Sequence, residues 1–385
     1  MKSAYFNKLI QSVDKDYLRL LLILSITLVF NSLSPWLPVI GAFIATLLTR
    51  NFKLSGSASF LLVLWLVYDF LGLSNGNTSV QMAIYLTLPS ILFFYLGNEF
   101  VRRARSAYNV YLTIFVMITS LALPHILVTI YDIYEVGLVN PDRFLAILGE
   151  DNQRSITQRT IEISLCIGSI GLLFQNTTDK TSKRLNRLMV IVSVLAFLCA
   201  LHYVSRTGVV ICLVSLSVGV LYNWGISFKT IFFVGVALIF YTWLQGTELF
   251  DVYAQRETDY SNISNAGLRM PRWEWAWNTT FENPLGTVGF LKAEHPYAHN
   301  FWLDLGKNCG VLPFFMMILF SLNHLRNIIK LVRCRIPLLS FAFTLWTLTC
   351  YMSLFTEPIH EGATLFMFIY FFYCGVTEQI VNGNK

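Results

Sequence analysis

Long apolar runs recur along this chain from residue 18 to residue 379, and they restrict its fold more than any motif does. Of its 385 residues, 55% are hydrophobic and 13% are charged. Soluble domains usually carry about 25% charged residues. Because the runs are continuous and do not alternate, membrane-spanning helices are expected and a closed β-barrel is not. The sequence therefore predicts an all-α, polytopic integral membrane protein.

The apolar runs divide into about twelve expected spans within a single membrane domain, residues 1–385. They fall at 18–34, 36–49, 58–73, 80–96, 108–131, 160–175, 188–205, 208–222, 230–245, 305–323, 337–355 and 363–379. Two longer connections remain, at 132–159 and 246–297, and loops of such length are uncommon unless they are functional. The first run follows several basic residues and lacks a small-residue cleavage site, so it is predicted to be a retained span.

Basic residues predict the orientation of these spans. With the N-terminus in the cytoplasm, 19 of the 28 Lys and Arg residues fall in cytoplasmic segments. The bias survives every crossing, which predicts an even number of spans and both termini inside. Nine basic residues fall on the outer side: Arg143, Arg154, Arg159, Arg206, Arg256, Arg269, Arg272, Lys292 and Lys307. Since they run against the bias, they predict an anionic ligand or local ion pairs.

Several classes of function are disfavoured by what the sequence lacks. The seven cysteines have no paired spacing, which argues against a disulfide framework or a zinc site. No phosphate-binding loop, dinucleotide-binding glycine fingerprint or HExxH motif occurs, so no cofactor or metal is expected. The net charge of +6 follows from the topological bias and does not indicate a nucleic-acid partner.

The stretch LHYVSRTGVV, residues 201–210, joins two apolar runs through a tight outer hairpin. Arg206 would lie in this hairpin, near the membrane surface. A guanidinium there can grip a phosphate through two parallel hydrogen bonds. Taken alone, the residue is explained more simply as an arginine that extends to lipid headgroups.

Residues 267–290, GLRMPRWEWAWNTTFENPLGTVGF, predict a short amphipathic helix lying at the membrane interface. Pro271 suits its first turn, and an Asn-Pro pair at 283–284 would end it. Trp273, Trp277 and Phe281 recur every four residues on one face. Arg269 and Arg272 fall at the N-terminal end, where free backbone N–H groups also favour an anion. The alternative is a surface helix that only anchors the loop.

In the stretch HPYAHNFWLDLGKNCGVLPFF, residues 295–315, polar groups stand where an apolar run begins. His299 is a candidate general base and Asn300 a candidate partner of a sugar hydroxyl. Gly306 and Gly310 would allow close approach of helices. The alternative is a polar helix start in which Asp304 and Lys307 pair at i, i+3.

The last outer hairpin, LFTEPIHEG at 354–362, carries Glu357, His360 and Glu361. Carboxylates here could bind acceptor hydroxyls or act as a base, and Glu357 is the candidate substrate-binding residue. A solvated turn, or a balance of charge against the outer arginines, explains the same residues. All four stretches fall on the same predicted side of the membrane.

The order of these motifs resembles the bacterial O-antigen polymerase and O-antigen ligase superfamily. That family has an arginine in a short outer hairpin, then a long periplasmic loop with an arginine four residues before a tryptophan and a P-x-G-x-x-G-like turn, and then a His-Asn pair ahead of a glycine. The matching residues are Arg206; Arg269, Trp273, Pro284, Gly286 and Gly289; and His299, Asn300 and Gly310. The specific motifs lie between about 200 and 315. Pro313 stands where the family often has a second glycine, and Arg272 competes with Arg269 for the family position.

The resemblance implies a metal-independent, inverting membrane glycosyltransferase with a GT-C-like helical fold and a donor glycan on undecaprenyl pyrophosphate. Arg206 and Arg269 would hold the pyrophosphate, and His299 would activate or position the acceptor hydroxyl. The protein would lie in the bacterial inner membrane with its site facing the periplasm. A lipid-linked repeat unit as acceptor makes it a polymerase, which the acidic hairpin favours, with a chain-length regulator as a further partner. Lipid A-core as acceptor would make it a ligase.

A transporter or lipid flippase is the alternative from another class. Its expected signs are inverted repeats, broken helices at matched positions and charge pairs near mid-membrane. The sequence shows no repeat, and its charges keep mostly to the ends of spans.

Overall fold

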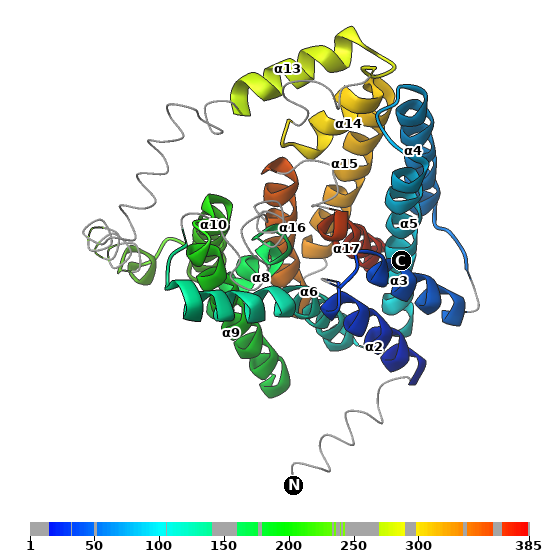
Figure 1. Ribbon diagram of the computed structural model, residues 1–385. Coiled ribbons are helices and arrows are strands. Elements are labelled where there is room, and N and C mark those ends of the chain that lie inside the picture. Colours follow the sequence, from blue (N-terminus) through cyan, green and yellow to red (C-terminus); the bar gives the residue numbers. More distant parts are fainter. Residues whose placement is uncertain are drawn as a thin grey trace.

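The computed structural model describes residues 15–31, 33–49, 52–104, 106–140, 160–175, 179–232, 269–288, 298–333, 337–356 and 364–383, with positions 235, 239 and 242. Within these ranges every regular element is a helix (Figure 1). They are α2 (Lys15–Val29), α3 (Trp36–Thr49), α4 (Gly56–Ser74), α5 (Val80–Arg103), α6 (Ala107–Val136), α8 (Ser164–Gly168), the 3-10 helix η1 (Ser169–Phe174), α9 (Lys180–His202), α10 (Arg206–Trp224), α13 (Arg269–Glu282), α14 (Phe301–Cys309), α15 (Val311–Arg333), α16 (Pro337–Thr356) and α17 (Thr364–Gly383). The predicted all-α class is confirmed for this part of the chain.

Eight described helices are long and apolar enough to cross a membrane: α4, α5, α6, α9, α10, α15, α16 and α17. Each coincides with an expected span, as a multi-pass membrane protein requires. Three further expected spans coincide with shorter helices. Of these, α2 has 15 residues and α3 has 14, whereas a bilayer core of about 30 Å takes about 20. The expected span at 230–245 and most of both long connections lie outside the described ranges.

Several expected boundaries were wrong: α5 ends at Arg103 and not at 96, α9 begins at Lys180 and not at 188, and two further differences have a glycine as their cause. The span predicted at 305–323 is divided between α14 and α15, because Gly310 between them has a left-handed φ of 88°. Glycine adopts this conformation without the clash that a Cβ would cause. Helix α6 continues to Val136, past the expected end at residue 131, and stops at Gly137 with φ 101°.

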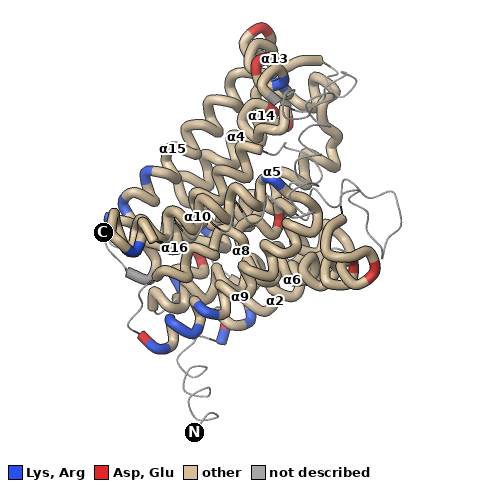
Figure 2. Tube along the Cα trace, turned by 90° about the vertical axis from the view of Figure 1, so that its left-hand side faces the viewer, with Lys and Arg blue, Asp and Glu red and all other residues tan. Residues whose placement is uncertain are grey.

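One end of the helical bundle collects basic residues, and we call it the basic end. Arg103 donates to the carbonyl of Thr49 at 3.3 Å, which joins the ends of α5 and α3. Ser55 donates to Glu378 at 3.2 Å, which brings the start of α4 to the last turns of α17. Figure 2 shows most Lys and Arg residues at this end, in the lower left of the view.

The opposite end holds the loops that follow α4 and α13. The side-chain amide of Asn75 donates to the Leu285 carbonyl at 2.8 Å. The amide of Asn77 donates to the Asn308 carbonyl at 2.8 Å. These bonds tie α13 and α14 to the α4–α5 connection, so the segment after α13 is bound into the bundle.

Helices α5 and α17 form the most extensive contact between described helices. A Cβ on Gly97 would lie 2.1 Å from the Phe372 carbonyl oxygen, and one on Gly375 would lie 2.0 Å from the Phe94 carbonyl oxygen. The two backbones therefore touch through small residues, as helices in membranes commonly do. In the most apolar 18-residue stretch of α17, 89% of the residues are buried.

Candidate functional site

Arg206 is the first residue of α10 and is half-buried. The preceding residue, Ser205, caps the helix: its hydroxyl oxygen accepts from the Gly208 backbone N–H at 3.3 Å. Before it, Val204 is buried and has a left-handed φ of 51°. A β-branched residue seldom adopts this conformation, so the turn that carries Arg206 is strained. The tight hairpin predicted here is confirmed.

Contacts with α6 and with the residues after it hold this turn in place. The Tyr203 hydroxyl donates to the carboxylate of Asp132, and both side chains are buried. The Asn140 backbone N–H donates to the His202 carbonyl at 2.8 Å. Asp132 and Tyr203 were not among the predicted site residues, since Asp132 lies on the largely apolar α6, Tyr203 directly follows α9, and they are 71 positions apart.

Helix α10 runs beside α8 and η1 in the same direction. A Cβ on Gly208 would lie 3.4 Å from Ile167, and one on Gly219 would lie 2.7 Å from the Gly171 carbonyl oxygen. The first turn of α10, which begins at Arg206, therefore lies near the segment that precedes α8. That segment contains Glu162, which is fully buried and bonded to the imidazole of His125 on α6. This buried pair was not among the predicted site residues.

The predicted helix is present as α13, and two of its aromatic residues contact neighbouring helices, although Trp277 and Phe281 are 50% and 40% exposed. Its position at the membrane interface stays a prediction. The Trp273 indole N–H donates to the Ala298 carbonyl at 3.0 Å, and its ring meets Phe355 edge-on at 4.9 Å. The ring of Trp277 meets Phe314 of α15 at 5.9 Å. The helix begins at Arg269 and ends at Glu282, immediately before the Asn-Pro pair.

The two arginines of α13 lie in its first turn. For Arg269 the structure describes the backbone position, at the first residue of the helix. Arg272 is half-buried, and its Nε is a buried donor with no hydrogen-bond partner among the described residues. Since an unsatisfied buried donor is costly, this atom is available to an acceptor brought by a ligand.

His299 lies on the turn that leads into α14 and is half-buried, with a left-handed φ of 54°. Asn300 caps α14, because its side-chain oxygen accepts from the Leu303 backbone N–H at 3.2 Å. The side-chain amide of Asn300 also donates to the Phe355 carbonyl at 3.4 Å. The His299 turn is thereby attached to the last residues of α16.

A buried ion pair lies in α14, close to this turn. Lys307 Nζ lies 3.2 Å from Asp304 Oδ1, and neither side chain is exposed to solvent. The i, i+3 pairing that the alternative interpretation expected is confirmed. Burial raises the pKa of the Asp304 carboxyl and lowers the pKa of the Lys307 ammonium, while each charge opposes the shift of the other. Gly306 makes room here, because a Cβ would lie 2.7 Å from the Thr280 side chain of α13.

Helix α16 joins the two halves of the candidate site. Tyr222, near the far end of α10, contacts Phe341 at the start of α16 with ring centroids 4.7 Å apart, so the two helices are antiparallel. The Arg206 turn and the end of α16 consequently lie at the same end of the bundle. Ser353 of α16 donates to Ser164 of α8 at 2.9 Å.

Helix α16 thus contacts α13 and the turn of His299 and Asn300 on one side. On its other side it contacts α8 and α10. The described contacts do not join Arg206 directly to His299. Glu357 and the rest of the acidic hairpin, 357–363, lie outside the described residues.

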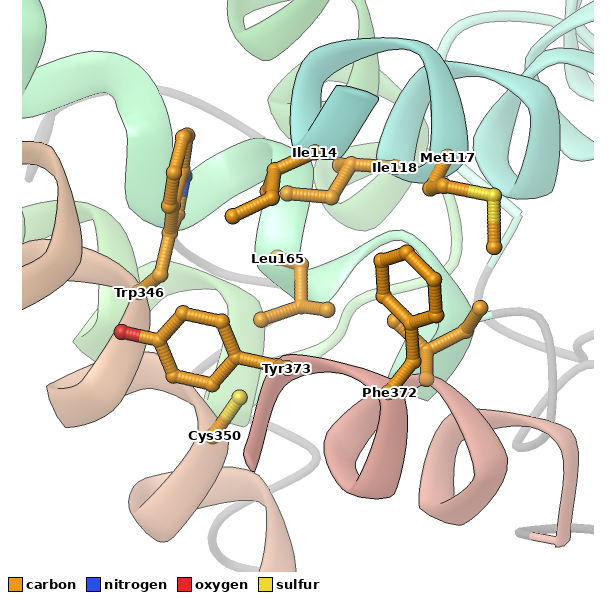
Figure 3. A pocket seen from close by; sticks show the side chains of 9 residues that line it. Ile114, Met117, Ile118, Leu165, Trp346, Cys350, Phe372 and Tyr373 are labelled. Carbon is orange, nitrogen blue, oxygen red and sulfur yellow. The ribbon is translucent and has the colours of Figure 1, made fainter. Parts of the chain in front are cut away.

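A small apolar cavity of about 10 Å³ lies deeper, among α6, α8, α16 and α17. Figure 3 shows Leu165, Trp346 and Phe372 directed towards it. With this lining it cannot accept a charged group, since a cavity needs polar partners even to hold a water molecule. This cavity therefore takes no part in the polar chemistry of the turns at the end of the bundle.

Those turns present guanidinium groups that can bind an anion, an imidazole that can accept a proton, and a side-chain amide that can bind a hydroxyl. Comparison of the sequence with protein-family models and with curated proteins gives no match.

Proposed function

We propose that this protein is an O-antigen polymerase, a glycosyltransferase that takes a glycan from undecaprenyl pyrophosphate and joins it to a lipid-linked repeat unit. The observation that carries the proposal is the position of the candidate residues. The Arg206 turn, the start of α13 and the His299 turn belong to the end of the bundle opposite the basic end. Arginines away from the basic end are explained by an anionic ligand, and a lipid pyrophosphate is such a ligand at the membrane surface.

The proposed orientation follows from the same asymmetry. The basic end faces the cytoplasm, both termini lie there, and the candidate site faces the periplasm of the inner membrane. The chain crosses the membrane twelve times, with 246–297 as its long periplasmic loop. A chain-length regulator is a proposed protein partner, and the surrounding bilayer delivers both lipid-linked substrates.

In the proposed reaction Arg206 and Arg269 hold the pyrophosphate of the donor, with Arg272 beside them. The acceptor hydroxyl oxygen attacks C1 of the donor sugar from the side opposite the pyrophosphate. The bond from C1 to the phosphate oxygen breaks, and its electron pair leaves on undecaprenyl pyrophosphate, whose charge the guanidinium groups stabilise. His299 takes the proton of the hydroxyl. Asn300 and Glu357 bind acceptor hydroxyls, and the anomeric centre is inverted.

The test is the lipopolysaccharide ladder of a strain that lacks this protein, complemented with the wild type, Arg206→Ala, Arg269→Ala or His299→Ala. Core carrying a single repeat unit is expected in the deletion strain and in the three variants. Arg326→Ala is the matched control, because this exposed arginine lies on the basic half of α15, and it should restore the long ladder.

Other outcomes separate the alternatives. Bare core with accumulated lipid-linked polymer would identify a ligase. An unchanged ladder in the deletion strain would overturn the proposal for this polymer. Purified protein in liposomes should lengthen a lipid-linked oligosaccharide, whereas movement of that lipid across the bilayer without lengthening would identify a flippase.

A further inference from the structure

His299 is held in a backbone conformation that it would seldom adopt by itself. Its φ of 54° and that of Val204 are the left-handed values at non-glycine positions within the described residues. Such a residue persists only where the surrounding structure over-determines it. The question is which groups hold the turn at His299.

Asp304 bonds to the chain on both sides of His299. Its Oδ1 accepts from the Ala298 backbone N–H at 2.8 Å, and its Oδ2 accepts from the Asn300 backbone N–H at 3.4 Å. The two oxygens of one carboxylate thus bind the backbone N–H groups of the two residues next to His299, Ala298 and Asn300. Backbone N–H groups that donate to a carboxylate form stronger bonds than those that donate to a neutral acceptor.

Lys307 in turn holds Asp304. Its ammonium lies 3.2 Å from Asp304 Oδ1 and 5.4 Å from the centre of the Trp275 ring on α13. A cation placed over an indole face is attracted by it. The pair is therefore fixed between α14 and α13, and it is completely buried, so neither residue can touch a substrate.

We propose that Asp304, held by Lys307, is a positioning residue that keeps the His299 turn in its left-handed conformation. The carboxylate acts through the backbone and not on the reacting atoms. The consequence for transfer rests on the function proposed above, whereas the effect on His299 itself does not. The imidazole should lose its fixed direction when Asp304 can no longer bind both N–H groups.

The test uses the full-length protein in lipid nanodiscs and two variants. Asp304→Asn keeps the shape but loses one of the two acceptor oxygens. Asp304→Asn combined with Lys307→Met also removes the unpaired buried ammonium, and so keeps a folded protein available if the single variant fails to fold. Glu99→Gln is the control, because Glu99 pairs with Arg103 at 2.8 Å at the basic end.

The measurement is the rate at which diethyl pyrocarbonate modifies the His299 imidazole, followed by mass spectrometry of its peptide. We expect the rate to rise at least threefold in the variants of Asp304 and to stay within experimental error in Glu99→Gln. An unchanged rate in a folded Asp304 variant would overturn the proposal. An equal rise in the control would do the same, since it would indicate general loosening.

Transfer activity gives a separate readout. If the proposed function holds, Asp304→Asn should lower kcat at least tenfold and leave KM for the lipid-linked donor within twofold, as expected when a proton acceptor is misplaced. A wild-type protein without transfer activity would defeat the proposed function, but the rate of His299 modification would still decide the role of Asp304.

Discussion

The carbonyl oxygen of Pro284 accepts a hydrogen bond from the Val311 backbone N–H at 3.0 Å, across the break between α14 and α15. The same oxygen lies 2.0 Å from the position of a Cβ on Gly310. The turn after α13 is thus inserted against the break, and it leaves room for glycine alone.

Replacement of Gly310 by alanine should therefore strain the backbone and displace the turn after α13. At φ 88° a Cβ costs of order 1–3 kcal/mol before any clash is counted. We expect a loss of at least about 3 kcal/mol in the free energy of unfolding, measured in mixed micelles. Gly76→Ala is the matched control, since Gly76 has φ 68° and open space around its Cβ, and it should cost only about 1–2 kcal/mol. Equal losses in the two variants would show that a Cβ on Gly310 does not clash with the Pro284 carbonyl oxygen.

The buried pair of Asp304 and Lys307 should show non-additive effects on stability. Either single change, Asp304→Asn or Lys307→Met, should lower the free energy of unfolding by roughly 3–5 kcal/mol, because it leaves one buried partner without its counter-charge. The double variant should cost less than the sum of the two. Arg19→Met serves as control: Arg19 pairs with Asp16, but its side chain is 72% exposed, and the change should stay within about 1 kcal/mol.

Trp273 should contribute through its indole N–H as well as its ring. Trp273→Phe keeps an aromatic ring against Phe355 but removes the donor to the Ala298 carbonyl. The free energy of unfolding should fall by about 1–3 kcal/mol, since a buried acceptor loses its partner. Trp277→Phe, at a position that is 50% exposed, should cost less than half as much. Equal costs would show that ring size matters and the hydrogen bond does not.

Gly375 should tolerate no side chain, because α17 meets the backbone of α5 at this point. Gly375→Ala places a Cβ 2.0 Å from the Phe94 carbonyl oxygen and should cost at least about 3 kcal/mol, or abolish folding. Gly383→Ala lies in the same helix with open space around it and should leave the melting temperature within about 2 °C. A stable Gly375→Ala protein would contradict the close approach of α5 and α17.

Tyr203 should stabilise the turn before Arg206 through its bond to Asp132. Tyr203→Phe leaves the buried carboxylate without this donor and should lower the free energy of unfolding by about 1–3 kcal/mol. Tyr222→Phe, on the exposed face of α10, should change it by less than about 0.5 kcal/mol. If the protein is a glycosyltransferase, Tyr203→Phe should also weaken binding of the lipid-linked donor. The turn that carries the Arg206 guanidinium would then lack the hydrogen bond that holds it.

Local sequence signals were enough to predict much of the fold and parts of the candidate site. The limits of α13 follow from Pro271 and from the Asn-Pro pair at 283–284, and the hairpin at Arg206 follows from the polar gap between two apolar runs. The break at Gly310 could also have been predicted from the sequence. A glycine commonly ends a helix, and Pro313, three positions later, suits the first turn of the next helix.

The partners of the buried polar groups could not be predicted in this way. Asp132 meets a tyrosine 71 positions away, and His125 meets a glutamate 37 positions away. A single polar residue on an apolar helix is compatible with many partners, and only the packing of α6 against its neighbours selects one. The left-handed turn at Val204 is hidden for the same reason, since Asp132 binds the neighbouring Tyr203 from a distant helix. The turn at His299 is held by Asp304, close in sequence, but an aspartate in an i, i+3 pair with a lysine gives no sign that it also binds this backbone.

The contact between α5 and α17 has a consequence for how the protein is made. Helix α5 leaves the ribosome long before α17, and all the helices from α6 to α16 are synthesised in between. Until α17 arrives, the groove around Gly97 must be filled by lipid chains or by a chaperone of the insertion machinery. Assembly of the centre of the bundle therefore waits for α17, and a ribosome that stalls before α17 would leave α5 without its partner helix.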